Sequence, residues 1–200
     1  MVLINEAQQT YGVGEEALDF SLPGTDGKTY FLESFSSAKV LVIVFTCNHC
    51  PYAQVYMPRI IQLQKDFVKK GVQFVGINPN DSVAYPDDSF EEMKVWAEKW
   101  GLNFPYLRDE TQETAMAYKA VCTPDIFVFD SQRKLRYRGK VDDSSPYDQP
   151  KTAKNFWLRE AIDLALQQKS PKTAFRPVMG CSIKWKKKNE PQFLSIKASK

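Results

Sequence analysis

The sequence predicts an α/β layered domain in which helices cover both faces of a mixed sheet. Segments with strand-like and helix-like patterns alternate in the order strand, helix, strand, helix, strand, strand, helix, which is typical of a parallel core with a late antiparallel hairpin. The run VLVIVF at 40–45 is apolar at every position, as in a central strand covered on both sides. Hydrophobic residues make up 43% of the 200 residues, which is enough for a core without disulfides.

The first third of the chain contains a predicted hairpin, a buried strand and a helix. Residues 17–35 predict two short strands around a glycine-containing turn, and residues 38–46 predict the central strand. From Cys50 to Gly71, apolar residues recur at helical spacing, and the glycine is expected to end the helix. The apolar stripe consists of Ala53, Tyr56, Met57, Ile60, Ile61, Phe67 and Val68.

The middle of the chain repeats this order. Residues 72–78 predict a second buried strand, and residues 79–88 a loop with two prolines. Ser89 and Glu92 form a capping box that opens a further helix. Residues 104–109 predict a short strand or extended segment.

The last elements are a small helix, a hairpin and a closing helix. The small helix is expected over about 111–120, and the hairpin pairs 125–130 with 134–140. Residues 152–168 form an amphipathic pattern that predicts the closing helix. We therefore expect a domain over residues 1–168.

Residues 169–200 are predicted to be a basic C-terminal extension with little periodicity. The extension carries nine Lys or Arg residues against one acidic residue, whereas the first 168 residues have a net charge of about −5. Such a segment is usually solvated; the alternative is contact of the run KWKKK with an acidic partner or a nucleic acid. No other segment has the pattern of a nucleic-acid-binding motif, so we expect no nucleic-acid partner.

We expect a cytoplasmic protein with no membrane segment. The first residues, MVLINEAQQTYG, lack the basic and apolar regions of a signal peptide, and no stretch approaches the ~20 apolar residues of a membrane span. Four cysteines are too few for a disulfide-stapled secreted scaffold. In the reducing cytosol, a Cys-x-x-Cys motif is more often reactive or metal-binding than structural.

The segment FTCNHCP places two cysteines three residues apart at the end of the central strand. We predict that Cys47 lies at the N-terminal end of the next helix, where the helix dipole and free N–H groups stabilise a thiolate. Cys47 is then the nucleophile, and Cys50, one turn inside, attacks the mixed disulfide and releases the product. His49 is predicted to stabilise the thiolate further; the alternative is a solvated turn residue.

The same three side chains are also suitable metal ligands. A closed zinc site needs four ligands, usually from two separated pairs, and the chain has no second histidine. The other cysteines, Cys122 and Cys181, each stand alone in the sequence. We therefore expect no metal, and no organic cofactor because thiols supply the electrons. Inert packing of both motif cysteines is the remaining alternative.

Several segments resemble the thioredoxin superfamily over roughly residues 15–168. DFSLPGTDGKTY resembles the N-terminal strand-turn-strand of the peroxiredoxin-type AhpC/TSA branch, and FTCNHCP stands where thioredoxins carry Cys-Gly-Pro-Cys. CTPDIFVFD resembles the segment with a cis Thr-Pro bond, and MGCSIKWK is similar to uncharacterised peroxiredoxin-like bacterial proteins. The resemblance implies a thioredoxin-like three-layer fold with an N-terminal β-hairpin extension and a C-terminal tail.

The resemblance also implies a substrate-binding role for the loop around Thr123–Pro124. In thioredoxin-like folds this loop packs against the dithiol, and the residue before the cis-proline pairs with an incoming peptide. Cys122 lies in the same loop, either as a third thiol that traps a disulfide or as a small buried residue. Cys181 is either an additional redox thiol or a packed or free one, and Ile183 and Trp185 would dock the tail onto the domain.

The chain departs from both peroxiredoxins and thioredoxins. At the position of the peroxiredoxin threonine, three residues before the cysteine, Cys50 has Cys47 and Cys47 has Val44. The place of the peroxiredoxin arginine is taken by Pro124, and Asn48–His49 replaces the Gly-Pro of thioredoxin. Peroxide activation and ordinary thioredoxin substrates are therefore poorly supported.

The predicted function is that of a thiol–disulfide oxidoreductase. Its partners would be protein or small-molecule thiols and disulfides, with a cellular thiol as reductant. One alternative is an antioxidant thiol peroxidase in which a motif cysteine forms a sulfenic acid. The other is a non-enzymatic binding module with a thioredoxin fold. The sequence leaves open whether the protein is a monomer or a homodimer.

Overall fold

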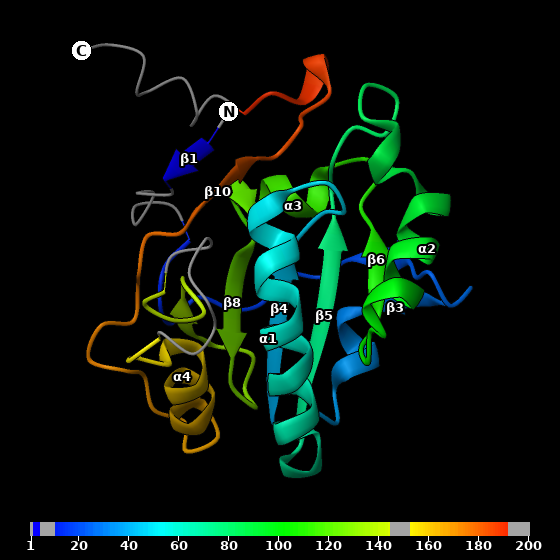
Figure 1. Ribbon diagram of the computed structural model, residues 1–200. Helices are drawn as coiled ribbons and strands as arrows, with labels where there is room; N and C mark the ends of the chain where they lie inside the picture. Colours follow the sequence, from blue (N-terminus) through cyan, green and yellow to red (C-terminus); the bar gives the residue numbers. More distant parts are fainter. Residues whose placement is uncertain (1, 5–10, 145–152, 192–200) are drawn as a thin grey trace, which may run out of the picture.

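The computed structural model describes residues 2–4, 11–144 and 153–191. Its centre is a five-stranded mixed sheet with the order β6-β5-β4-β8-β9 (Figure 1). The strands are β4 (Val40–Phe45), β5 (Val72–Asn78), β6 (Tyr106–Arg108), β8 (Asp125–Phe129) and β9 (Leu135–Arg138). β4, β5 and β6 run parallel, whereas β8 is antiparallel to both β4 and β9. The predicted parallel core with a late hairpin is confirmed.

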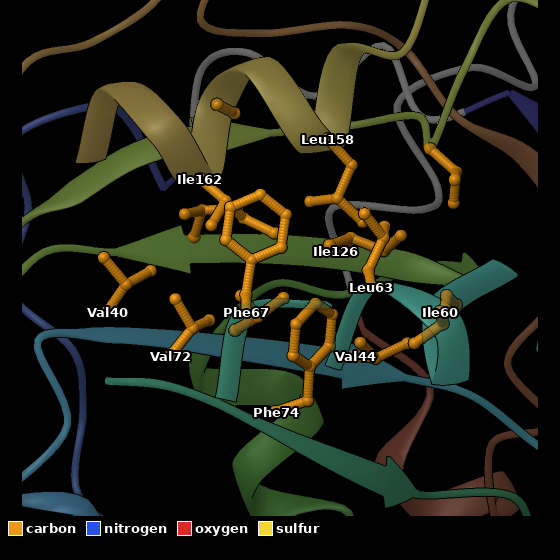
Figure 2. Packing of buried hydrophobic residues seen from close by; sticks show 14 of the residues in the cluster. Val40, Val44, Ile60, Leu63, Phe67, Val72, Phe74, Ile126, Leu158 and Ile162 are labelled. Carbon is orange, nitrogen blue, oxygen red and sulfur yellow. The ribbon is translucent and has the colours of Figure 1, made fainter. Parts of the chain in front are cut away.

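Two helices, α1 (Pro51–Phe67) and α4 (Trp157–Ala165), cover one face of this sheet. Every residue of β4 is fully buried, as its continuous apolar run predicts, because the strand lies in the middle of the sheet with cover on both faces. Figure 2 shows the contacts between helix and strand side chains in this layer, which include Leu63, Phe67, Leu158, Ile162, Val40, Val44, Val72, Phe74 and Ile126.

The opposite face is covered by α3 (Glu113–Ala117) and by the segment 11–35. That segment includes the predicted hairpin, formed by β2 (Ser21–Pro23) and β3 (Thr29–Phe31). α2 (Phe90–Trp100) lies beside β6 at the edge of the sheet (Figure 1). The layered architecture with cover on both faces is therefore the one that the sequence predicts.

The helix ends follow local chemistry, with two corrections. The Ser89 side chain accepts the backbone N–H of Glu92 and caps α2, and Gly71, at φ 86°, ends the turn that follows α1. The predicted stripe extended one residue too far, because Val68 is 49% exposed and begins a 3-10 turn. The closing helix was predicted over residues 152–168 but begins at Trp157. The described residues just before it are therefore not helical, contrary to the prediction.

A second, three-stranded sheet joins both ends of the described chain to the middle. β10 (Met179–Ser182) pairs antiparallel with β1 (Val2–Ile4) on one side and with β7 (Cys122–Thr123) on the other. The predicted C-terminal extension is therefore built into a sheet over this part, which corrects the expectation of an irregular segment. Residues 192–200 of that extension lie outside the described residues.

The tail docks through the side chains that the sequence singled out. Ile183 is buried, and Trp185 packs against the apolar cluster on the α3 face of the main sheet. Among the residues described, no helix is long and apolar enough to cross a bilayer.

Candidate functional site

The Cys-x-x-Cys motif forms the turn that connects β4 to α1. Cys47 lies two residues beyond Phe45, the last residue of β4, and Cys50 is the N-cap of α1, with an extended backbone (φ −74°, ψ 117°). Pro51 occupies the first helical turn, where its missing N–H costs nothing. The turn lies at the carboxyl end of a parallel strand, the edge at which open α/β sheets bind ligands.

Both motif cysteines are reduced and fully buried against the loop of Thr123. The Cys47 Sγ lies 3.3 Å from the Thr123 Oγ1, and the protonated Cys50 thiol donates to the Thr123 carbonyl oxygen over 3.2 Å. The Thr123–Pro124 peptide bond is cis. The structure therefore brings Thr123 into contact with both sulfurs.

The Cys50 sulfur is the one that ionises readily. Its pKa falls from an ordinary 9.0 to about 5, first because the Cys47 thiol is its hydrogen-bond partner. Burial opposes this change, whereas the Thr123 side chain, the backbone N–H of Ala53 and the Cys181 thiol each lower the pKa further. The N-cap position of Cys50 therefore adds to the effect of the Cys47 thiol through the N–H of Ala53, in the first turn of α1.

The order in which Cys47 attacks and Cys50 resolves stays a prediction, and the acidities of the two sulfurs favour the opposite order. Burial raises the pKa of Cys47 well above its ordinary value, and the neighbouring Cys50 and the Asp88 carboxylate add to that rise. The sequence prediction assigned the thiolate to Cys47 because it expected the dipole and free N–H groups of the helix to act on that sulfur. α1 begins at Pro51 with Cys50 as its N-cap, so Cys50 is the sulfur nearer to the helix N-terminus.

A buried carboxylate organises the turn from the other side. Asp88 is fully buried and accepts the backbone N–H of Asn48 (2.7 Å), the side-chain amides of Asn80 (2.7 Å) and Asn78 (3.3 Å), and lies 2.5 Å from the Nδ1 of His49. Burial would raise the pKa of Asp88, but these partners together hold it below its usual range. The carboxylate thus fixes both residues between the cysteines.

His49 interacts with this carboxylate and with an aromatic ring. Its pKa is raised, chiefly by the hydrogen bond to Asp88, and its ring stacks on Tyr85 with centroids 5.6 Å apart and planes 5° apart. The Nδ1 side of the ring faces the carboxylate. The role of His49 as a pKa tuner of the thiols stays a prediction.

Sequence reasoning missed Asp88 and its two asparagine partners. A signal existed, because Asn78 ends the strand parallel to β4, and the carboxyl ends of neighbouring parallel strands meet at one edge. The loop after β5 was interpreted only as a connection. Its polar residues, Asn80 and Asp88, instead fold back under the cysteine turn.

Three potential metal ligands meet at this point. Ligand atoms of Cys47, His49 and Asp88 lie within 4.8 Å of one another. The Asp88 oxygens already accept three N–H groups and contact His49, so the carboxylate needs no cation to satisfy it. The donor set is one ligand short of a closed zinc site, and we assign it no metal.

The structure separates the two remaining cysteines. Cys122 is buried with Val121 and Val178 in a small packing cluster of its own, and burial raises its pKa. Cys181, in β10, packs instead against the cluster that contains Cys47 and Cys50. Strand alternation explains the separation, because Thr123 faces the dithiol and its neighbour Cys122 faces the other way.

A cavity of about 360 Å³ opens beside the Pro124 loop. Its lining includes Tyr56 from α1, Pro124 from the loop before β8, and Met179 from β10. The cavity therefore lies between the helix that starts at the motif and the tail strand.

The chain resembles known proteins in both its sequence and its fold. The family model described as AhpC/TSA family matches residues 13–138. The crystal structure of an uncharacterized conserved protein from Geobacillus kaustophilus is 41% identical, with a TM-score of 0.86 over 94% of this chain and 97% of that one. A hypothetical protein from Sinorhizobium meliloti 1021 is 35% identical, with a TM-score of 0.84 over 90% and 97% of the two chains. The thiol-disulfide oxidoreductase ResA of Geobacillus thermodenitrificans is 27% identical over 124 residues, which are 62% of this chain and 67% of the relative.

Proposed function

The chain belongs to the AhpC/TSA family and has a thioredoxin-like fold, and from this premise we propose that it is a thiol–disulfide oxidoreductase whose redox centre is the Cys47–Cys50 pair. The observation that carries the proposal is the Cys50 sulfur at the N-cap of α1, with a pKa of about 5 and a second thiol as its hydrogen-bond partner. A stabilised thiolate beside a second thiol is the reduced form of a thiol–disulfide couple.

The reaction is a two-electron exchange. When the Cys47 and Cys50 sulfurs join in a disulfide, the pair releases two electrons and the Cys47 proton, and with a second proton from solvent these reduce a substrate disulfide to two thiols. In the opposite direction, two equivalents of a reducing thiol restore the pair and leave as a disulfide. The low pKa of Cys50 stabilises the reduced form of the pair. The Cys47–Cys50 disulfide is therefore a stronger oxidant than a disulfide whose cysteines have ordinary pKa values.

The substrates that fit this chemistry are thiols and disulfides of proteins or small molecules. The name of the ResA relative, a thiol-disulfide oxidoreductase, supports this class. We place the cycle in the cytoplasm, where a cellular thiol returns the disulfide to the dithiol. The loop of Thr123–Pro124 is the proposed substrate platform because it contacts both sulfurs.

Insulin reduction with a dithiol as electron source tests the proposal. Cys47→Ser and Cys50→Ser should each abolish the reduction, and Val95→Ser, a control at an exposed position of α2, should retain it. Mass spectrometry after mild oxidation should find a Cys47–Cys50 disulfide in the wild type. Full activity in either serine variant, or no disulfide between the two residues, would rule the proposal out.

A thiol peroxidase is the second candidate, and the low pKa of Cys50 at the N-cap favours it. Peroxide would oxidise the thiolate to a sulfenic acid, which a neighbouring thiol would condense to a disulfide with loss of water. One observation speaks against a peroxidase, since peroxiredoxins use an arginine at the reactive sulfur. The buried Arg138 guanidinium here pairs with Asp125 at 2.7 Å rather than with a sulfur. Peroxide consumption, together with trapping of a sulfenic acid at Cys50, would favour this candidate over disulfide exchange.

A further inference from the structure

The Cys47–Cys50 pair has no direct access to solvent. Both side chains are 0% exposed, with the Thr123 loop on one side and the Asp88 network behind the turn. Thiol–disulfide exchange requires the attacking sulfur to reach the sulfur that it attacks. A large substrate therefore needs another route to the pair.

β10 supplies a third sulfur at this position. Its register places Cys181 opposite Thr123, the residue that contacts both buried sulfurs, and Cys181 packs against Cys47 and Cys50. Cys181 is partly exposed, and in the described part of the chain it is the member of this thiol cluster that reaches solvent. Figure 1 shows β10 beside the N-terminal end of α1, where the motif lies.

The close approach of β10 is built into its sequence. A Cβ atom at Gly180 would overlap the carbonyl oxygen of Thr123, which is also the acceptor of the Cys50 thiol. Glycine at this position lets the two backbones come together, so that Cys181 lies against the pair. The contact is therefore a property of the strand pairing and not of a loose tail.

We propose that Cys181 is the sulfur through which outside thiols and disulfides exchange with the buried pair. This inference rests on the proposed function and names the route into its site. When a substrate disulfide oxidises the pair, the Cys181 thiolate attacks that disulfide, forms a mixed disulfide and releases one substrate thiolate. Cys50 then attacks the Cys181 sulfur, forming a Cys50–Cys181 disulfide and releasing the second substrate thiolate.

The exchange ends within the cluster. Cys47 loses its proton and attacks the Cys50 sulfur, which forms the Cys47–Cys50 disulfide and returns Cys181 to its thiol. The net change is one substrate disulfide reduced to two thiols and one enzyme dithiol oxidised to a disulfide. The reverse sequence, driven by two equivalents of a reducing thiol, restores the dithiol.

The acidities of the two sulfurs favour the reducing direction of this route, in which an outside thiol opens the Cys50–Cys181 disulfide. Burial, together with the neighbouring Cys50, raises the pKa of Cys181 to about 11, whereas the pKa of Cys50 is about 5. A thiol that attacks the Cys50–Cys181 disulfide at the exposed Cys181 sulfur expels the Cys50 thiolate, which is the better leaving group. Attack at the buried Cys50 sulfur would instead expel the Cys181 thiolate, which is the poorer leaving group.

The first test identifies the sulfur that meets the outside reagent, with oxidised glutathione as the probe. In a Cys47→Ser variant, one equivalent should give a Cys50–Cys181 disulfide. In a Cys47→Ser, Cys50→Ser double variant, glutathione should be found on Cys181. A Cys47→Ser, Cys181→Ser double variant keeps Cys50 and lacks the other two sulfurs of the cluster. If glutathione reacts with Cys50 of this double variant as fast as it reacts with the Cys47→Ser variant, the route through Cys181 is refuted.

The second test measures the exchange rate. Cys181→Ser, which keeps a hydrogen-bond donor near Cys50, should slow insulin reduction by at least about tenfold, equivalent to ~1.4 kcal/mol in the barrier. Val95→Ser, at an exposed position of α2, is the control and should keep the wild-type rate. If the wild type forms the Cys47–Cys50 disulfide and turns over while Cys181→Ser is equally fast, the route fails and the proposed function stands. If the wild type does neither, the proposed function itself fails.

A glycine pair separates the strand contact from general stability. Gly180→Ala should lower the yield of the Cys50–Cys181 disulfide in the Cys47→Ser background because the added methyl group displaces β10 from Thr123. Gly12→Ala is the control, since the nearest neighbour of its added Cβ is the Glu15 side chain, 3.8 Å away. Equal disulfide yields in the two variants would overturn the role assigned to the strand.

Discussion

Replacement of Cys47 by alanine should raise the pKa of Cys50 by about 1–2 units. The hydrogen bond from the Cys47 thiol is the first cause of the low Cys50 pKa, which is about 5 in the wild type. A hydrogen bond to a charged group contributes ~1.5–3 kcal/mol. Since one pKa unit corresponds to ~1.4 kcal/mol, its loss should move the Cys50 pKa to about 6–7.

Ultraviolet thiolate absorbance, followed as a function of pH on the reduced protein, measures this change. The wild type should show a single thiolate step below neutral pH, because the pKa values of Cys47, Cys122 and Cys181 are all raised. The step should disappear in Cys50→Ser and move to higher pH in Cys47→Ala.

The control is Cys122→Ala, which should leave the step in place because Cys122 packs in a separate cluster. A first step that survives in Cys50→Ser and vanishes in Cys47→Ala would assign the thiolate to the other sulfur and refute the reasoning. An unchanged step in Cys47→Ala would show that the helix N-terminus alone sets the pKa.

The remaining predictions concern the groups that hold the site and the sheet. Asp88→Asn should lower the free energy of unfolding, measured in urea, by ~3–5 kcal/mol because it disrupts a buried, fully hydrogen-bonded charge. Asp87→Asn, at the exposed neighbour, should change that free energy little. Equal losses in the two variants would contradict the role of the network. The pKa of His49 is raised above 6.5 in the fold, so its stabilisation is fully present below that pH and is lost as pH rises through the folded pKa. The stability difference between wild type and His49→Gln should therefore shrink on going from pH 6 to pH 9 or so, and a difference that widens would reverse the sign. Arg138→Met should lower the free energy of unfolding by ~3–5 kcal/mol because it removes one partner of a buried ion pair. Lys134→Met, in an exposed pair, should lower it by no more than ~1 kcal/mol. Comparable losses of the two variants in thermal unfolding would refute this ranking.

The main sheet could be predicted from the sequence because its signals are local. An unbroken apolar run defines β4, Gly71 ends the first helical segment, and Ser89 caps α2. Each of these features acts within a few residues, where periodicity and capping chemistry decide the outcome.

β10 could not be predicted in the same way. Its four residues, Met179–Ser182, have no alternating pattern, and their partners Val2–Ile4 and Cys122–Thr123 are distant in the sequence. Strand pairing of this kind depends on long-range contacts that composition does not encode. The docking of Ile183 was foreseen because a buried side chain leaves a local apolar signal.

The members of the site could be predicted, and the order in which its two cysteines act stays a prediction. The residues Cys47, Cys50 and Thr123 meet as expected, and the low pKa of Cys50 favours that sulfur as the thiolate. Proline favours the first helical position, so Pro51 already indicated that the residue before it is the N-cap. Asp88 lies forty residues from Asn48 in the chain, and only the fold brings them together.

The pairing of β10 with β7 has a consequence for synthesis of the chain on the ribosome. All five strands of the main sheet, and the motif itself, are made before residues 179–182 emerge. Domains fold from the N-terminal side as they are made, so a nascent chain can present its reactive sulfurs uncovered for a short time. During that time the pair lacks Cys181 as a neighbour, and arrival of the last strand places this third sulfur against it.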